Sequence, residues 1–72
     1  MDAKAVSKRL IDARGEKPQR VVAAAVNISV SALGMYESGQ RVPRDDIKER
    51  LADYYGTTVG SLFFNEMSHN VT

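Results

Sequence analysis

Apolar residues recur at helical spacing along the chain, in short segments separated by residues that end helices. The first segment spans residues 3–14 and is predicted to be a helix, followed by Gly15 as the residue that ends it. Its apolar positions are Val6, Leu10, Ile11 and Ala13. No segment shows a convincing strand pattern, so the distribution of apolar residues predicts an all-α chain.

The next segment, residues 18–26, is predicted to be a second short helix. Pro18 suits the first position of a helix, where its missing N–H is not needed. Asn27 can adopt the left-handed conformation that ends a helix. The residues expected in the core are Val22, Ala23 and Val26.

A third helix is predicted from Ser29 to about Ser38. Ser29 is a favourable N-cap residue, and Ile28 before it is placed to contact Leu33, as in a hydrophobic staple. Leu33 and Tyr36 are expected on the buried side. For Tyr36 the hydroxyl could alternatively reach a phosphate group.

Two further helices are predicted, over about residues 45–55 and 58–63. Asp45 and Asp46 are well placed at the start of the fourth helix, where the helix dipole stabilises negative charge. Thr58 is expected to cap the fifth helix. The expected core residues of these helices are Ile47, Leu51, Tyr54, Leu62 and Phe63.

The length of 72 residues allows one small domain with one core. We expect residues 1–64 to form this domain and the polar residues 65–72 to form a flexible tail. The sequence has no cysteine, no apolar run long enough to span a membrane and no signal-peptide pattern. These features favour a cytoplasmic protein.

The formal net charge is only +1, but the charges are unevenly distributed. Residues 1–44 contain eight Lys and Arg against four Asp and Glu, whereas residues 45–72 contain two against five. This asymmetry can produce a basic face for nucleic acid on a nearly neutral protein. The alternative is an ordinary solvated helix surface. We expect Lys4, Lys8 and Arg9 to form such a surface on the first helix.

The segment from Pro18 to Pro43 has the layout of a helix-turn-helix, in which a second short helix enters a DNA major groove. With the residues that follow, it resembles the Cro/repressor (XRE-like) helix-turn-helix family of small phage and bacterial regulators. The resemblance covers roughly residues 4–64. The matching residues are Gln19, Ala23, Ile28, Ser29, Leu33, Tyr36, Glu37, Gly39, Pro43, Ile47, Leu51, Tyr54, Tyr55, Gly56, Val59, Leu62 and Phe63.

The resemblance implies a compact five-helix, lambda-repressor-like DNA-binding domain that acts as a sequence-specific transcriptional regulator. It implies that Gln19 contacts a phosphate or an outer base. It also implies that Glu37 pairs with an arginine of the first helix, for which Arg14 is the candidate. The implied partners are a double-stranded DNA operator and a second copy of the chain.

The expected DNA-binding residues lie on the second and third helices and in the segment that follows. They are Gln19, Arg20, Ser29, Val30, Ser31, Ala32, Gly34, Met35, Gln40, Arg41 and Arg44. The arginines and glutamines suit phosphate groups. Among the exposed positions expected on the third helix only Ser31 is polar, so this helix cannot provide bidentate base readout, which is worth roughly 1–3 kcal/mol per base pair. Its apolar side chains could instead contact thymine methyl groups.

Protein partners are a second expectation. The apolar residues at the end of the fold could form a dimer interface, which would place two third helices about 34 Å apart, one turn of DNA. These residues are Leu62, Phe63, Phe64 and Met67. The apolar third helix also leaves a second function open, in which the chain is a protein-interaction module that binds and modulates another repressor protein.

Catalytic and metal chemistry finds little support in the sequence. It contains no nucleophile–base constellation and no glycine-rich phosphate loop. His69 has no second His, Cys or carboxylate cluster near it. Asp45 and Asp46 are adjacent, and adjacent residues of a helix do not face each other. We therefore expect no enzyme activity, no metal site and no cofactor.

Overall fold

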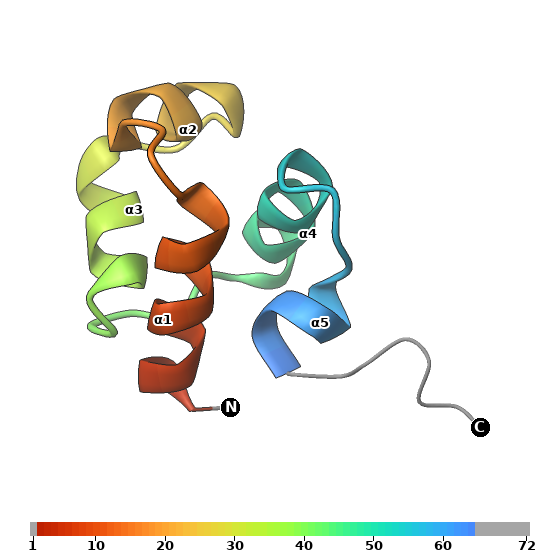
Figure 1. Cartoon of the computed structure of the whole chain (residues 1–72). Helices are drawn as coiled ribbons and strands as arrows, with labels where there is room; N and C mark the ends of the chain where they lie inside the picture. The colour runs from red at the N-terminus through yellow and green to blue at the C-terminus, as the bar shows by residue number, and fades with distance from the viewer. Residues whose placement is uncertain (1, 65–72) are drawn as a thin grey trace.

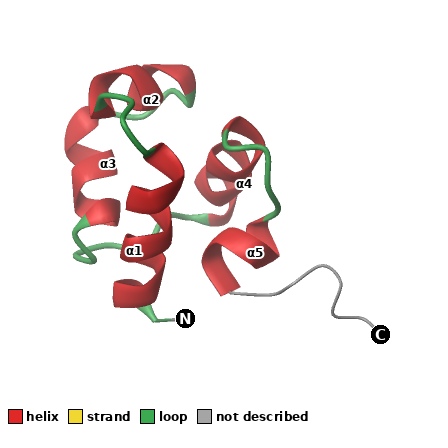
Figure 2. Ribbon diagram, viewed as in Figure 1, coloured by secondary structure: helices red, strands yellow, loops and turns green. Residues whose placement is uncertain are grey.

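The computed structural model describes residues 2–64 and shows an all-α fold, as predicted. Five helices and no strand are present in this part of the chain (Figures 1 and 2). Each helix begins and ends within one residue of its predicted bounds. The helices are α1 (Ala3–Arg14), α2 (Gln19–Ala25), α3 (Val30–Glu37), α4 (Asp45–Tyr54) and α5 (Val59–Phe64).

The helices pack around α1, which lies between α3 on one side and α5 on the other (Figure 1). Helix α2 packs across α3, and α4 packs against α5. The loop between α3 and α4 carries the chain from one side of α1 to the other, and these two helices diverge instead of packing closely. Among residues 2–64 no helix has the length and apolar content needed to cross a bilayer.

Local chemistry explains where the helices begin and end. Ser29 accepts a hydrogen bond from the backbone N–H of Ala32, and Thr58 accepts one from Ser61, so both caps were predicted correctly. Asn27 has a φ of 61°, the left-handed conformation expected after α2. These caps satisfy backbone groups that helix ends otherwise leave unpaired.

The core is a single cluster that draws on all five helices. Its partly buried border includes Ile28, as expected for a residue placed to contact Leu33. The buried apolar residues are Val6, Leu10, Val22, Ala23, Val26, Leu33, Tyr36, Ile47, Leu51, Ala52, Leu62 and Phe63.

Two of the four apolar positions that predicted α1 lie on the surface. Ile11 and Ala13 are exposed, whereas Val6 and Leu10 are buried. The buried side of α1 repeats every four residues, and its next position after Leu10 is Arg14, which turns inward to an acidic partner. The last position on the buried side of α1 is therefore a charged residue.

The hydroxyl of Tyr55, at the C-terminal end of α4, is buried without a hydrogen-bond partner among the described residues. Its ring lies edge-on to Tyr54, with the ring centroids 5.4 Å apart. Burial, and after it the nearby charge of Glu37, raises the pKa of Tyr55 from 10.0 to about 12. A buried hydroxyl that makes no hydrogen bond lowers the stability of a fold.

We therefore expect Tyr55→Phe to raise the free energy of unfolding by about 1 kcal/mol. Between pH 10 and about pH 12 the unfolded chain has released the Tyr55 proton while the folded chain retains it, so wild-type stability falls as pH rises through this window. Tyr55→Phe has no hydroxyl to titrate at this position, so its stability should not fall for this reason. Urea unfolding at about pH 7 and about pH 11 measures both effects, with Tyr54→Phe as the control; a destabilised Tyr55→Phe variant would refute the assignment.

Candidate nucleic-acid interface

Helix α2, a four-residue turn and α3 form one packed unit. The turn is closed by a hydrogen bond of 2.9 Å from the Ile28 N–H to the Ala23 carbonyl. Asn27 in its left-handed conformation reverses the chain, and Ser29 then caps α3. Because Leu33 of α3 and Val22 of α2 are both fully buried in the shared core, the angle between the two helices is fixed by packing.

The side of α3 that faces away from the core is almost wholly apolar. Val30 is 46% exposed and Met35 is 36% exposed. Ser31 is exposed between them and is the one hydroxyl at the centre of this face, whereas Ala32 is partly buried. Of the predicted α3 residues, the structure exposes Val30, Ser31 and Met35 and leaves Ala32 and Gly34 partly buried, so the exposed chemistry is apolar with a single hydroxyl.

Gly34 lies in the middle of α3, and a Cβ placed there would meet nothing within 4 Å. The fold therefore does not require a glycine at this position. Glycine inside a helix costs about 1 kcal/mol relative to alanine. Its presence leaves a hollow on the exposed face where the backbone of α3 can be approached closely.

We expect Gly34→Ala to stabilise the domain by about 1 kcal/mol and to raise Tm by roughly 4–8 °C. If the hollow receives a ligand, the same variant should bind that ligand more weakly despite its higher stability. Thermal unfolding followed by circular dichroism measures the first effect. An unchanged or lowered Tm would show that Gly34 has a structural role that open space around its Cβ position does not reveal.

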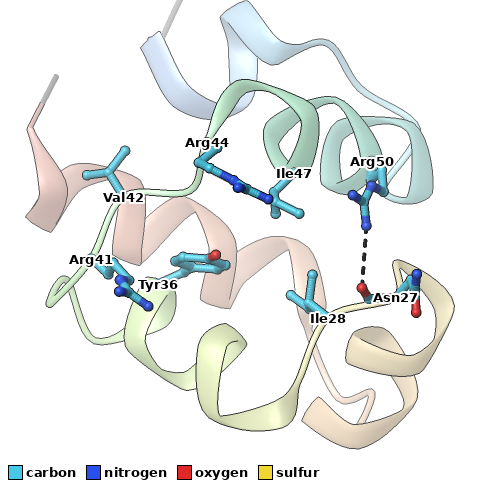
Figure 3. Close-up of a pocket in the computed structure, with 8 residues that line it drawn as sticks. All are labelled: Asn27, Ile28, Tyr36, Arg41, Val42, Arg44, Ile47 and Arg50. Atoms are coloured by element: carbon cyan, nitrogen blue, oxygen red, sulfur yellow. Dashed lines mark hydrogen bonds between the residues drawn. The ribbon is translucent and has the colours of Figure 1, made fainter.

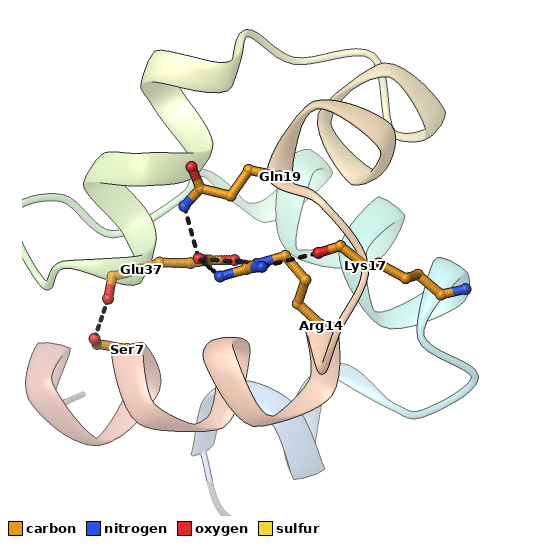
Figure 4. Close-up of polar contacts among 5 residues, drawn as sticks. All are labelled: Ser7, Arg14, Lys17, Gln19 and Glu37. Carbon is orange, nitrogen blue, oxygen red and sulfur yellow. Dashed lines mark hydrogen bonds and ion pairs between the residues drawn. The ribbon is translucent and has the colours of Figure 1, made fainter.

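A buried ion pair joins α1 to the end of α3. The Arg14 Nε lies 2.8 Å from Glu37 Oε2, and Arg14 Nη2 donates to Oε1 at 3.0 Å. The Arg14–Glu37 pairing implied by the family resemblance is thus confirmed. The hydrogen bonds that Arg14 donates to Glu37 raise the pKa of Arg14 above its ordinary value, so the guanidinium stays charged. The Ser7 hydroxyl also donates to the Glu37 carbonyl oxygen (Figure 4).

Gln19, at the start of α2, belongs to the same network. Its Nε2 donates to Glu37 Oε1 at 2.8 Å. A carboxylate only accepts hydrogen bonds, so this contact fixes the orientation of the amide. Figure 4 shows the amide oxygen directed away from Glu37. Gln19 therefore ties α2 to α3 and retains its amide oxygen and one N–H for an outside contact.

The predicted cationic residues are all exposed. Arg20 lies at the start of α2, and Arg41 lies in the loop after α3. Arg44 precedes α4, with its Nε 3.6 Å from Asp46 Oδ1. Gln40, in the same loop, donates from Nε2 to the Ser38 hydroxyl at 3.0 Å. The structure thus places one exposed arginine before the exposed face of α3 in the chain and two after it.

A groove of about 480 Å³ lies between α3 and α4, and no sequence pattern indicated it. It is lined by Tyr36, Arg41 and Arg44, and on the α4 side by Arg50 (Figure 3). Arg50 donates from Nη1 to the Val26 carbonyl at 2.9 Å and thereby connects α4 to the end of α2. The sequence signal for Arg50 is its spacing of four residues from Asp46, with which it pairs at 3.0 Å.

The four residues predicted to form a dimer interface are separated by the fold. Leu62 and Phe63 are buried in the core of the single chain, so these two side chains hold the domain together. Phe64 is 48% exposed, and the Lys48 Nζ lies 5.2 Å from its ring centroid. Met67 lies outside the described residues, as does the predicted tail. Of the predicted interface, Phe64 is the exposed member that the structure describes.

The packed α2–turn–α3 unit and its exposed third helix define a helix-turn-helix protein. Residues 8–62 match the family model for the helix-turn-helix domain, and the chain belongs to this family. Membership indicates a DNA-binding regulator. Searches among curated proteins and among solved structures gave no match. Within residues 2–64 no group of three or more His, Cys, Asp or Glu side chains could hold a metal ion.

Proposed function

We propose that this chain is a sequence-specific transcriptional regulator of the Cro/repressor type, derived from a phage or mobile element, that acts in the cytoplasm on a double-stranded operator. The observation that supports this function best is the exposed face of α3, held at a fixed angle by the core and by the Arg14–Glu37 pair. A helix presented in this way fits a major groove.

Base recognition in this proposal depends on small groups. Ser31 would donate or accept one hydrogen bond, and Val30 and Met35 would contact thymine methyl groups. The hollow at Gly34 would let a base edge or methyl group approach the backbone of α3. With little direct hydrogen bonding to bases, a large share of the specificity would come from DNA shape and deformability.

Residues at both ends of the α2–turn–α3 unit would position the protein on the DNA backbone. Arg20 would contact a phosphate next to α2, and Arg41 and Arg44 would contact phosphates next to the end of α3. Ser29 and Gln40 would add hydroxyl and amide contacts. Gln19, which is already bonded to Glu37, would contribute its remaining N–H or its amide oxygen.

A homodimer would bind a pseudo-palindromic operator with half-sites one DNA turn apart, about 34 Å. Phe64 is the described residue that supports this proposal, because about half of its surface remains exposed beside α4. Met67, which lies outside the described residues, would extend the interface.

Selection from a pool of random DNA duplexes, followed by sequencing, tests the proposed function. We expect enrichment of a thymine-containing pseudo-palindrome with half-sites separated by about one helical turn. Enrichment of a single half-site would support a sequence-specific regulator and exclude the proposed homodimer. Recovery of the unselected base composition after repeated rounds would contradict sequence-specific binding.

A second candidate function is supported by the same apolar face. Val30 and Met35, both exposed, could bury themselves in a groove of another repressor protein, which this chain would then modulate. Co-purification of such a repressor with the chain, lost in Val30→Glu and Met35→Glu, would favour this function. Retention of the partner by Met35→Glu would count against it.

A further inference from the structure

The groove between α3 and α4 has one wall from each helix and is closed at one end by the turn between α2 and α3 (Figure 3). It exists because α3 and α4 diverge, while the loop that joins them folds back along one side. Its volume of about 480 Å³ lies within the range of small-ligand sites in proteins. Ile28 and Ile47 are apolar lining residues, and most of the remaining lining is polar or charged.

The charges around the groove are strongly positive. Arg41 makes no ion pair with any of residues 2–64. Arg44 and Arg50 share one acidic partner, Asp46, at 3.6 Å and 3.0 Å. The groove is therefore lined by three guanidinium groups, two of which share one carboxylate, and a surplus of positive charge remains. Arginine presents several N–H donors in a fixed plane, which suits the oxygens of phosphate.

A second and independent feature is the hydroxyl of Tyr36. The residue is only 8% exposed, and it lines the groove with its hydroxyl oxygen in the space between α3 and α4 (Figure 3). This hydroxyl makes no hydrogen bond with any other described residue. The hydroxyl oxygen is accessible from the groove, where its hydrogen-bond partner is water or a bound group.

We propose that this groove is an anion site for a phosphate group, which accepts a hydrogen bond from the Tyr36 hydroxyl and charge-assisted hydrogen bonds from Arg41 and Arg44. Arg50 contributes charge from a position fixed by its bond to the Val26 carbonyl. The phosphate can belong to a free phosphorylated molecule or to a nucleic-acid backbone that passes along α3. Only the second source rests on the function proposed above.

The test uses the full chain with two probes: inorganic phosphate at constant ionic strength, and a mixed-sequence DNA duplex. Phosphate binding is followed by NMR through backbone amides and the arginine Nε–H groups, and duplex binding by fluorescence anisotropy. Tyr36→Phe keeps the buried ring and removes only the hydroxyl, and Arg41→Ala removes the unpaired cation. Tyr54→Phe and Lys4→Ala are the matched controls, because they remove a hydroxyl and an exposed cation elsewhere.

We expect phosphate to shift the signals of the groove residues saturably, and Tyr36→Phe and Arg41→Ala each to weaken binding about tenfold, as for loss of a hydrogen bond to a charged group. Weakened duplex binding in Tyr36→Phe assigns the phosphate to DNA, whereas weakening confined to free phosphate assigns it to a small molecule. Unchanged affinity for both probes in Tyr36→Phe overturns the proposal. Saturable phosphate binding without any duplex binding by the wild type would support the phosphate site in the groove and refute the proposed function as a DNA-binding regulator.

Discussion

Replacing Arg14 with methionine is expected to lower the free energy of unfolding by about 3–5 kcal/mol. The substitution keeps an unbranched side chain in place but leaves the Glu37 carboxylate buried with Gln19 as its remaining side-chain donor. A domain of 72 residues has a total stability of only about 4–11 kcal/mol. Urea unfolding followed by circular dichroism should therefore show a large fall in the midpoint, or a chain that is partly unfolded in buffer.

The relative stabilities of related variants test whether loss of the Arg14–Glu37 pair causes this destabilisation. Glu37→Gln should destabilise less than Arg14→Met, because Arg14 is partly exposed and can be solvated when its partner loses charge. The double variant Arg14→Met/Glu37→Met should recover part of the loss, since no unpaired buried charge remains. Lys8→Ala breaks an exposed pair with Asp12 and should change stability by less than about 0.5 kcal/mol. Equal effects of Arg14→Met and Lys8→Ala would contradict the role assigned to the buried pair.

Replacing Met35 with glutamate is expected to weaken duplex DNA binding by about a hundredfold or more. The new carboxylate would stand on the exposed face of α3, opposite base edges and between rows of phosphates, and like charges brought together at an interface cost several kcal/mol. Met35 is already partly exposed, so the stability of the domain should change by less than about 0.5 kcal/mol.

Ile11→Glu is the matched control for this prediction. Ile11 is an exposed apolar residue of α1, and glutamate at this position adds the same charge on a different helix, outside the exposed face of α3. It should reduce duplex affinity only slightly, through the lower net charge. Equal losses from Met35→Glu and Ile11→Glu would show that general charge, and not the exposed face of α3, controls binding.

The helices were predictable because their signals are local. Ser29 and Thr58 cap the helices that follow them, and Asn27 adopts a left-handed conformation, for reasons that involve only neighbouring residues. The exposed face of α3 was predictable for a similar reason, since Leu33 and Tyr36 determine which side of a short helix is buried.

The remaining features depend on contacts between distant segments. Leu62 and Phe63 could belong to a core or to a dimer interface by composition alone, and only the packing of α5 on α1 and α4 shows that they are core. The inward turn of Arg14 depends on Glu37, 23 residues away in sequence, and was expected only through the family resemblance. The groove with Tyr36 and Arg50 arises from the divergence of α3 and α4, which no local pattern encodes.

We expect the exposed α3 face and its flanking arginines to bind duplex DNA. Fluorescence titration of a duplex carrying the DNA that flanks the gene measures this affinity at several salt concentrations. With Arg20, Arg41 and Arg44 each neutralising one phosphate, log K should fall against log[salt] with a slope of about −2.7 per protomer, a loss of about 40-fold between roughly 50 and 200 mM salt. Arg20→Ala should reduce this slope by about one. Binding that is absent at low salt, or insensitive to salt, would contradict DNA binding by the exposed α3 face and these arginines.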